Sequence, residues 1–187
     1  ESAISSIIIV AGMTDIDYVA TNIVDKYNLT KVTQIIPGGD ERYDSVYNGL
    51  KAAHNIGSQY VMIHDGARPF VDGDTIDRCM ENVKKNRACI AGMPVKDTIK
   101  VVDDEDVIIS TPDRAALWMA QTPQCFETEL AYDSYKKLID TGRTEKVTDD
   151  AMVVEAFGGV PSVMVEASYN NLKVTTPIDI ILGEQLL

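Results

Sequence analysis

Short runs of apolar residues alternate along the chain with longer segments in which apolar residues recur at helical spacing. A short run rich in β-branched residues is typical of a buried strand, and a 3.6-residue period is typical of an amphipathic helix, so the alternation predicts an α/β fold. The predicted strands span residues 6–11, 32–36, 60–64, 88–95, 117–121, 160–166 and 173–175. The predicted helices span residues 15–27, 42–54, 74–84, 127–141 and 148–157, and a last helix starts at Pro177.

Near-continuous apolar strands that alternate with helices favour a mostly parallel sheet with helices on both faces. We therefore expect one three-layer, Rossmann-like domain over residues 1–187. The pattern changes where two short β runs, 98–102 and 107–111, flank the acidic turn 103–106. This arrangement predicts a hairpin, and an isolated hairpin is marginally stable in water, so it should pack on something. We expect residues of about 97–116 to form a protruding arm.

Composition narrows the possible functions. The 187 residues, 45% of them hydrophobic, are enough for one substantial core, and no apolar run reaches the roughly 18–20 residues of a membrane span. The net charge of −12 argues against a nucleic-acid surface and makes any local cluster of basic residues informative. Cys79, Cys89 and Cys125 form no C-x-x-C pair, so we interpret them as reduced thiols that pack inside a cytosolic protein.

Two glycine-bearing loops follow predicted strands, and each contains an arginine. Residues 38–46 read GGDERYDSV, and residues 64–70 read HDGARPF. In open α/β sheets, ligands bind outside the carboxyl ends of the strands. Glycine lets backbone N–H groups approach an anion, and arginine offers a planar fork to phosphate. The two loops therefore predict a pocket for a phosphorylated ligand.

Each motif also has a purely structural interpretation. The loop at 38–40 is compatible with an ordinary strand-to-helix turn, and Asp65 with Arg68 is compatible with an ion pair that stiffens its loop. Thr148–Asp150 is expected to cap a helix whatever else it does. The only histidines, His54 and His64, belong to no H-E-x-x-H motif and do not favour a zinc site.

The two loops and five further segments resemble the cytidylyltransferases that join CTP to 2-C-methyl-D-erythritol 4-phosphate in non-mevalonate isoprenoid synthesis. The further segments, in order, are VKDTIK at 95–100, DR at 113–114, QTPQ at 121–124, TDD at 148–150 and NLKVT at 171–175. The resemblance implies a cytoplasmic nucleotidyltransferase with the fold of the nucleotide-diphospho-sugar transferases. That family opens with a glycine-rich loop carrying an arginine and a lysine for the triphosphate. Residues 1–6 lead directly into residues 7–11, which match a later strand of the family, so we expect this sequence to be incomplete at its N-terminus.

The resemblance also implies roles for residues at the nucleotide. Gly39, Asp40 and Ser45 would surround the cytosine, and Arg42 would organise their loop. In the second loop, Asp65 and Gly66 would lie at the nucleotide, with Asp65 at the ribose or at a Mg²⁺ ion carried by the phosphates.

The acceptor side is implied in the same way. Asp65, Arg68, Thr148 and Lys173 would bind the polyol phosphate. The arm would cross to a second subunit of a homodimer, where Thr98 and Arg114 would complete the partner's pocket. Lys173 and Arg114 would hold the attacking phosphate. Two alternatives stay open: a ribitol-5-phosphate cytidylyltransferase, or a non-catalytic nucleotide-binding or dimerisation module.

Overall fold

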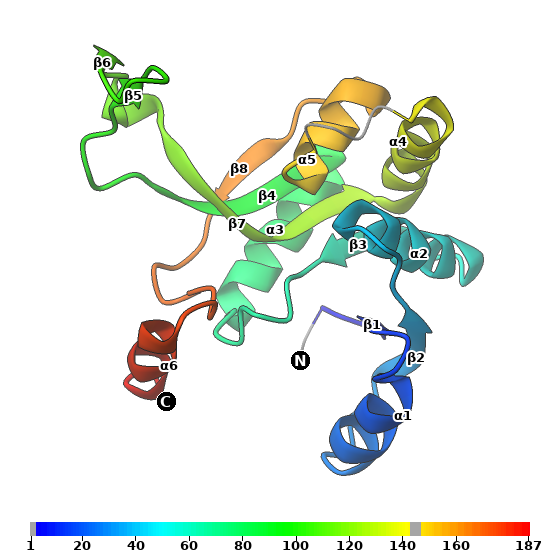
Figure 1. The fold of residues 1–187 in the computed structure, drawn as a ribbon. Coiled ribbons are helices and arrows are strands. Elements are labelled where there is room, and N and C mark those ends of the chain that lie inside the picture. Colours follow the sequence, from blue (N-terminus) through cyan, green and yellow to red (C-terminus); the bar gives the residue numbers. More distant parts are fainter. Residues whose placement is uncertain (1–2, 143–146) are drawn as a thin grey trace.

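The computed structural model describes residues 3–142 and 147–187, which form an α/β fold with mixed sheets (Figure 1). The strands are β1 (Ile7–Ala11), β2 (Val32–Pro37), β3 (Tyr60–Ile63), β4 (Ala88–Pro94), β5 (Val101–Val102), β6 (Ile108–Ser110), β7 (Trp118–Glu127) and β8 (Val163–Glu166). The helices are α1 (Ile16–Val19), α2 (Arg42–Asn55), α3 (Gly73–Asn86), α4 (Thr128–Thr141), α5 (Asp150–Val153) and α6 (Pro177–Glu184). The π-helical turns η1 (Ala20–Asp25) and η3 (Val154–Gly158) continue α1 and α5, and η2 (Arg114–Ala116) is a short 3-10 helix.

Local sequence signals account for most of these boundaries. At the start of α6, Pro177 is the first helical residue, and Thr176 and Asp179 form the reciprocal hydrogen bonds of a capping box. At the start of α3, the Asp72 carboxylate accepts a hydrogen bond from the Thr75 N–H at 2.6 Å. The predicted last helix is confirmed. The strand predicted at 173–175 is wrong, because these residues form no regular structure.

The sheets differ from the predicted single, mostly parallel sheet. In the described residues, β1 pairs with β2 in parallel, and a separate sheet has the order β3-β7-β4-β8. Within that sheet β4 and β8 are parallel, whereas β7 runs antiparallel to both β3 and β4. The reason is the connection: the chain leaves β4 and returns to β7 through the arm instead of through a crossover helix. Antiparallel neighbours require only such a return.

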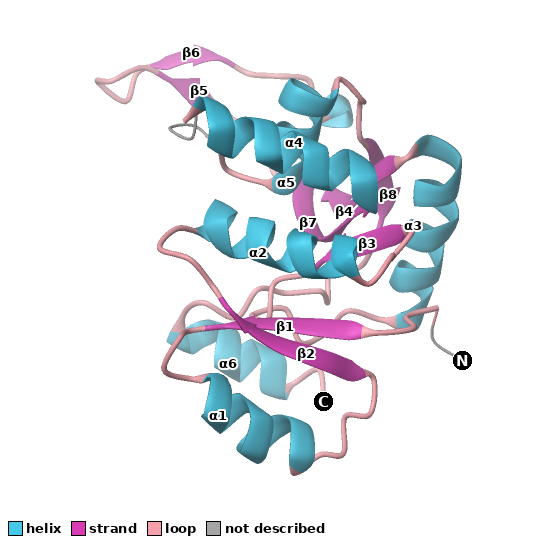
Figure 2. Ribbon diagram, turned by 90° about the vertical axis from the view of Figure 1, so that its right-hand side faces the viewer, coloured by secondary structure: helices cyan, strands magenta, loops and turns pink. Residues whose placement is uncertain are grey.

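Helices cover both faces of the four-stranded sheet. Along β4, Ala88 and Ile90 face a core that includes residues of α2, α4 and α5, whereas Cys89 and Ala91 face a core closed by α3. This alternation follows from the two-residue period of a strand. Figure 2 shows the same layering, with α4 and α5 on one side of β4 and β7, and with the β1–β2 pair below α2.

The arm projects from the body beyond the ends of β4 and β7 (Figure 1). Its strands β5 and β6 pair antiparallel, so the predicted hairpin is confirmed, although its strands are shorter than expected. The Asp103 carboxylate closes the turn by accepting hydrogen bonds from the N–H groups of Glu105 and Val107, both at 3.0 Å. The apolar side chains of β5 and β6 are exposed. In the described part of the chain, no helix has the length and apolar character needed to cross a membrane.

Candidate active site

The loop between β2 and α2 borders a surface hollow of about 310 Å³. The lining residues come from the ends of β1 and β2 and the start of α2: Val10, Ala11, Gly12, Met13, Gly38, Gly39, Asp40 and Ser45. The Gly39 N–H donates a hydrogen bond to Ser45 Oγ at 3.0 Å, which folds the loop against the helix. A Cβ atom on Gly39 would lie 2.3 Å from the Cβ of Asp44, so only glycine fits. The predicted residues Gly39, Asp40 and Ser45 are therefore brought together.

The hollow also includes residues that the sequence analysis missed. Gly12 and Met13 follow β1 and face the loop at 38–40 across the parallel β1–β2 pair. The signal was present, because Gly12 directly follows a predicted strand, as Gly38 nearly does. The volume of the hollow, about 310 Å³, lies at the lower end of the roughly 300–1,000 Å³ typical of small-molecule sites.

Arg42 does not line the hollow, and its side chain binds a buried carboxylate. Its Nη1 and Nη2 groups donate to the two carboxylate oxygens of Asp150, both at 2.8 Å. Asp150 is fully buried, and Tyr135 donates its hydroxyl to Asp150 Oδ1 at 2.5 Å. The hydrogen bonds to Asp150 raise the pKa of Arg42, and burial together with the carboxylate raises the pKa of Tyr135. Arg42 is thus held in one orientation, as expected for a bidentate pair.

The backbone at Asp150 is fixed as well. Gln124 Oε1 accepts hydrogen bonds from the N–H groups of Asp150 and Ala151, at 3.0 and 2.9 Å. The helix cap is Asp149, whose carboxylate accepts from the Met152 N–H at 2.9 Å. The expectation that residues 148–150 cap a helix is confirmed, and the capping residue is Asp149, not Thr148. Thr148 lies one residue earlier, exposed, and its hydroxyl donates to the sulfur of Met152 at 2.8 Å.

Asp65 joins Arg42 to Lys173. Its Oδ2 atom lies 2.8 Å from Lys173 Nζ, and its Oδ1 atom lies 4.0 Å from Arg42 Nη2. Burial would raise the pKa of Asp65, but the hydrogen bond from Lys173 and the charges of Lys173, Arg42 and Arg68 outweigh it, so this pKa is lowered. Asp65 is therefore an ionised carboxylate among three cations.

The segment that carries Lys173 is fastened to the loop after β3. Arg68 Nη1 donates to the Asn171 carbonyl at 2.8 Å, and the Val174 N–H donates to the Ala67 carbonyl at 2.7 Å. The buried Asn171 side chain in turn donates to the Thr122 carbonyl at 2.8 Å. The ion pair of Asp65 with Arg68 does not form, because Arg68 bonds to Asn171 instead. These contacts explain why residues 173–175 follow the loop and pair with no strand.

The arm residues lie elsewhere. Thr98 is exposed before β5, and Arg114, in η2, donates to the Lys96 carbonyl at 2.7 Å. No contact in the described part of this chain joins them to Asp65 or Lys173. Gly66 lies beside Asp65, with open space where a Cβ would point. One chain thus assembles Arg42, Asp65 and Lys173 but not the two arm residues.

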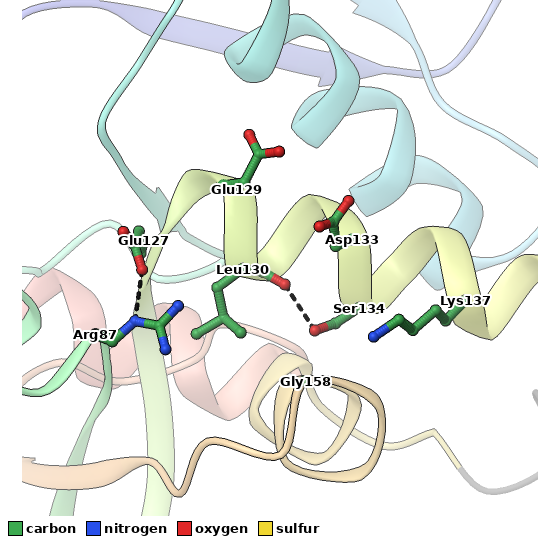
Figure 3. A pocket seen from close by; sticks show the side chains of 8 residues that line it. All are labelled: Arg87, Glu127, Glu129, Leu130, Asp133, Ser134, Lys137 and Gly158. Carbon is green, nitrogen blue, oxygen red and sulfur yellow. Dashed lines mark hydrogen bonds and ion pairs between the residues drawn. The ribbon is translucent and has the colours of Figure 1, made fainter.

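A second hollow, of about 270 Å³, lies between α4 and η3 (Figure 3). Its lining is Arg87, Glu127, Glu129, Leu130, Asp133, Ser134, Lys137 and Gly158. Three carboxylates against two cations disfavour an anionic ligand, and Arg87 is already paired with Glu127 at 2.6 Å. None of the predicted residues lines it, so the hollow at 38–40 with its neighbouring cations is the candidate site.

A mixed α/β fold with a glycine-lined hollow beside three cations is typical of proteins that bind phosphorylated ligands. A family model described as 2-C-methyl-D-erythritol 4-phosphate cytidylyltransferase matches residues 1–187, and the chain belongs to this family.

Individual relatives agree with the family assignment. The chain is 47% identical over 181 residues to a 2-C-methyl-D-erythritol 4-phosphate cytidylyltransferase of Clostridium botulinum, covering 96% of this chain and 77% of the relative. It is 44% identical over 184 residues to the corresponding protein of Alkaliphilus oremlandii, covering 98% and 76%. The structure matches a 4-diphosphocytidyl-2C-methyl-D-erythritol synthase of Anaerococcus prevotii with a TM-score of 0.86 and 33% identity, covering 97% of this chain and 78% of that one.

Replacing Asp150 by Asn is expected to lower the free energy of unfolding by about 3 kcal/mol, the lower end of the range for breaking a buried ion pair. The Asn amide group would face the N–H fork of Arg42, donor against donor, while Tyr135 would keep an acceptor. The measurement is urea unfolding followed by circular dichroism. Asp133→Asn, at the exposed hollow of Figure 3, is the control and should change stability by less than about 0.5 kcal/mol. Equal stability of the two variants would contradict the anchoring role of Asp150.

Proposed function

We propose that the chain transfers CMP from CTP to 2-C-methyl-D-erythritol 4-phosphate, which gives CDP-methylerythritol and pyrophosphate. Family membership supports this activity. The observation that carries it is the cluster of Arg42, Arg68 and Lys173 around Asp65, in a chain of net charge −12. The cluster adjoins the glycine-lined hollow because Arg42 begins the helix that the hollow loop precedes. A base in the hollow would place its phosphates toward these cations.

The reaction is an in-line attack by a phosphate oxygen of the acceptor on the α-phosphorus of CTP. Such a transfer needs positioning and neutralisation of charge more than a covalent protein group. Gly39, Asp40 and Ser45 would hold the cytosine. Lys173, whose side chain is 47% exposed, would hold the attacking phosphate while Asp65 keeps its ammonium group in place. Arg68 and Thr148 would bind the acceptor, and Gly66 would leave room for the nucleotide.

A Mg²⁺ ion is part of the proposal. Asp65 is its candidate ligand, because Lys173 lies on Oδ2 at 2.8 Å, whereas Oδ1 has only the longer 4.0 Å approach of Arg42. No other carboxylate or histidine of the described chain groups with Asp65 as a set of three potential ligands. One carboxylate suits an ion that takes its remaining ligands from phosphates and water. When bound, the ion would neutralise charge on the phosphates.

The proposal includes a cytoplasmic homodimer of Rossmann-like subunits. The exposed apolar residues of β5 and β6 support it, since a two-stranded hairpin is marginally stable alone. In a two-fold dimer, each arm would bring Thr98 and Arg114 to the partner's pocket. This arrangement would account for the absence of Thr98 and Arg114 from the cluster at Asp65.

The activity is tested by pyrophosphate release from CTP with Mg²⁺, using two acceptors in parallel. We expect rapid release with 2-C-methyl-D-erythritol 4-phosphate and slow release with ribitol 5-phosphate. CTP binding is measured in the same samples by calorimetry. A preference for ribitol 5-phosphate would overturn the proposed substrate, and CTP binding without turnover on either acceptor would favour a non-catalytic module.

Lys173→Ala is expected to remove about 2–4 kcal/mol of transition-state stabilisation, or roughly 30- to 1,000-fold in kcat/KM, by analogy with a lost oxyanion donor. The measurement is steady-state kinetics with varied acceptor concentration. Lys51→Ala is the matched control, since Lys51 lies over the ring of Tyr47 on α2 and outside the proposed site. Unchanged turnover in Lys173→Ala would remove Lys173 from the mechanism.

The double variant Ile108→Asp/Ile109→Asp is expected to give monomers and to lose activity at the same time. Both side chains are exposed on β6, at 58% and 62%, and burying two carboxylates in an apolar contact is costly. Sedimentation velocity and the pyrophosphate assay are run on the same samples, with Asp104→Asn in the arm turn as the control. An active monomer would refute the shared pocket.

A further inference from the structure

Helix α3 covers one face of the four-stranded sheet (Figure 1). The three cysteines come together on this face. Cys89 of β4 and Cys125 of β7 are directly opposite each other in the antiparallel register, so their side chains share one face. Cys79 of α3 lies over them. All three are fully buried, and their sulfur atoms lie within 4.8 Å of one another. Taken singly from the sequence, each thiol is a packing residue; the fold makes them a cluster.

We propose that Cys79, Cys89 and Cys125 form a buried site for one soft divalent metal ion. A metal–sulfur bond of about 2.3 Å places three sulfur ligands about 4 Å apart around one ion, which is compatible with sulfur atoms that all lie within 4.8 Å of one another. The proposal concerns a part of the molecule separate from the candidate active site and does not depend on the proposed reaction.

The surroundings of the cluster select for a soft ion. The thiols pack with the apolar side chains of Val83 and Val165, and the thioethers of Met62 and Met80 lie at the edge of the same cluster. Met62 is opposite Cys125 in the register of β3 and β7, so the sulfur side chains continue along the sheet. Thiolate and thioether ligands favour soft cations, whereas Mg²⁺ requires oxygen ligands.

Metal binding has to release protons, because the thiolate and not the thiol is the ligand. Binding through all three sulfur atoms sends three protons to the solvent and leaves a net charge of −1 around a divalent ion. The Cys89 thiol donates a hydrogen bond to the Cys79 carbonyl at 3.3 Å, and this bond is replaced by the metal–sulfur bond when the ion binds. Zn²⁺ in structural sites takes four ligands, so a three-sulfur site should favour a larger, softer ion over Zn²⁺.

Burial also predicts how the ion enters. Because no thiol is exposed, α3 has to separate locally from β4 and β7 before the ion reaches the sulfur atoms. Loading should therefore be slow, and a low urea concentration that leaves the protein folded should accelerate it.

The test is titration of the whole protein with Cd²⁺ under a phosphine reductant, which keeps the thiols reduced without supplying competing ones. We expect one Cd²⁺ per chain, a thiolate-to-metal charge-transfer band in the ultraviolet, and a raised melting temperature. Parallel samples receive Zn²⁺, expected to bind more weakly, and Mg²⁺, expected to produce none of these changes. The incubation extends until the signal is constant, so slow loading cannot be mistaken for absence of binding.

Cys79→Ser and Cys125→Ala should each weaken Cd²⁺ binding by more than roughly 100-fold, the upper range for loss of an outer-shell partner alone. His54→Gln is the matched control, because His54 with Glu129, at 3.0 Å, is an exposed pair that could bind the ion without sulfur. The affinity of the His54→Gln variant for Cd²⁺ and its charge-transfer band should be the same as those of the wild-type protein. The proposal is overturned if the folded wild-type protein gives no band, if the band appears only after unfolding, or if either cysteine variant binds as the wild type does.

Discussion

The buried carboxylate of Asp150 is the constraint on which the candidate active site depends. Removing a charge from water costs on the order of several kcal/mol unless it is paired and hydrogen-bonded. Arg42 and Tyr135 supply the charge and the hydroxyl donor, and Gln124 holds the adjacent backbone. The carboxylate thus ties α2 and α4 to the start of α5, and the backbone of the same residue is held by β7. The first turn of α2 is thereby placed.

Arg42 links the buried Asp150 to the surface, because its second carboxylate neighbour is the more exposed Asp65. Asp65 in turn pairs with Lys173, so negative and positive charges alternate from the core outward. In a chain of net charge −12, such a series keeps cations at one place where most of the surface would repel an anion. An incoming phosphate would extend the alternation by one more negative charge. The same contacts that stabilise the fold thus prepare the site for its ligand.

Features of the fold that are set by residues close together in the sequence could be predicted, whereas features set by distant residues could not. Helix starts such as Thr176–Asp179 are encoded within a few residues, and short β-branched runs such as β1–β3 mark their own ends, so these elements were predicted closely. The second half of β7, up to Glu127, was missed. The antiparallel direction of β7 could not be predicted from local sequence, because this direction depends on the arm that connects β7 to β4. Residues 173–175 look like a strand locally, but the buried Asn171 and the bond from Val174 to Ala67 hold them as a loop.

The site divides in the same way. Gly39 and Asp65 lie in loops after strands, and Ser45 lies in the first turns of the helix that follows the first loop, where local sequence and sheet geometry together point to a ligand. Lys173 could be connected to them only through a family resemblance, and Asp150 was expected only to belong to a helix-capping segment. Its partner Arg42 is 108 positions away, and an exposed and a buried acid look identical in that context. Asp150 can hold Arg42 in place because it is buried. Its burial depends on how α2, α4, α5 and β7 pack together and not on the sequence of any one of these elements.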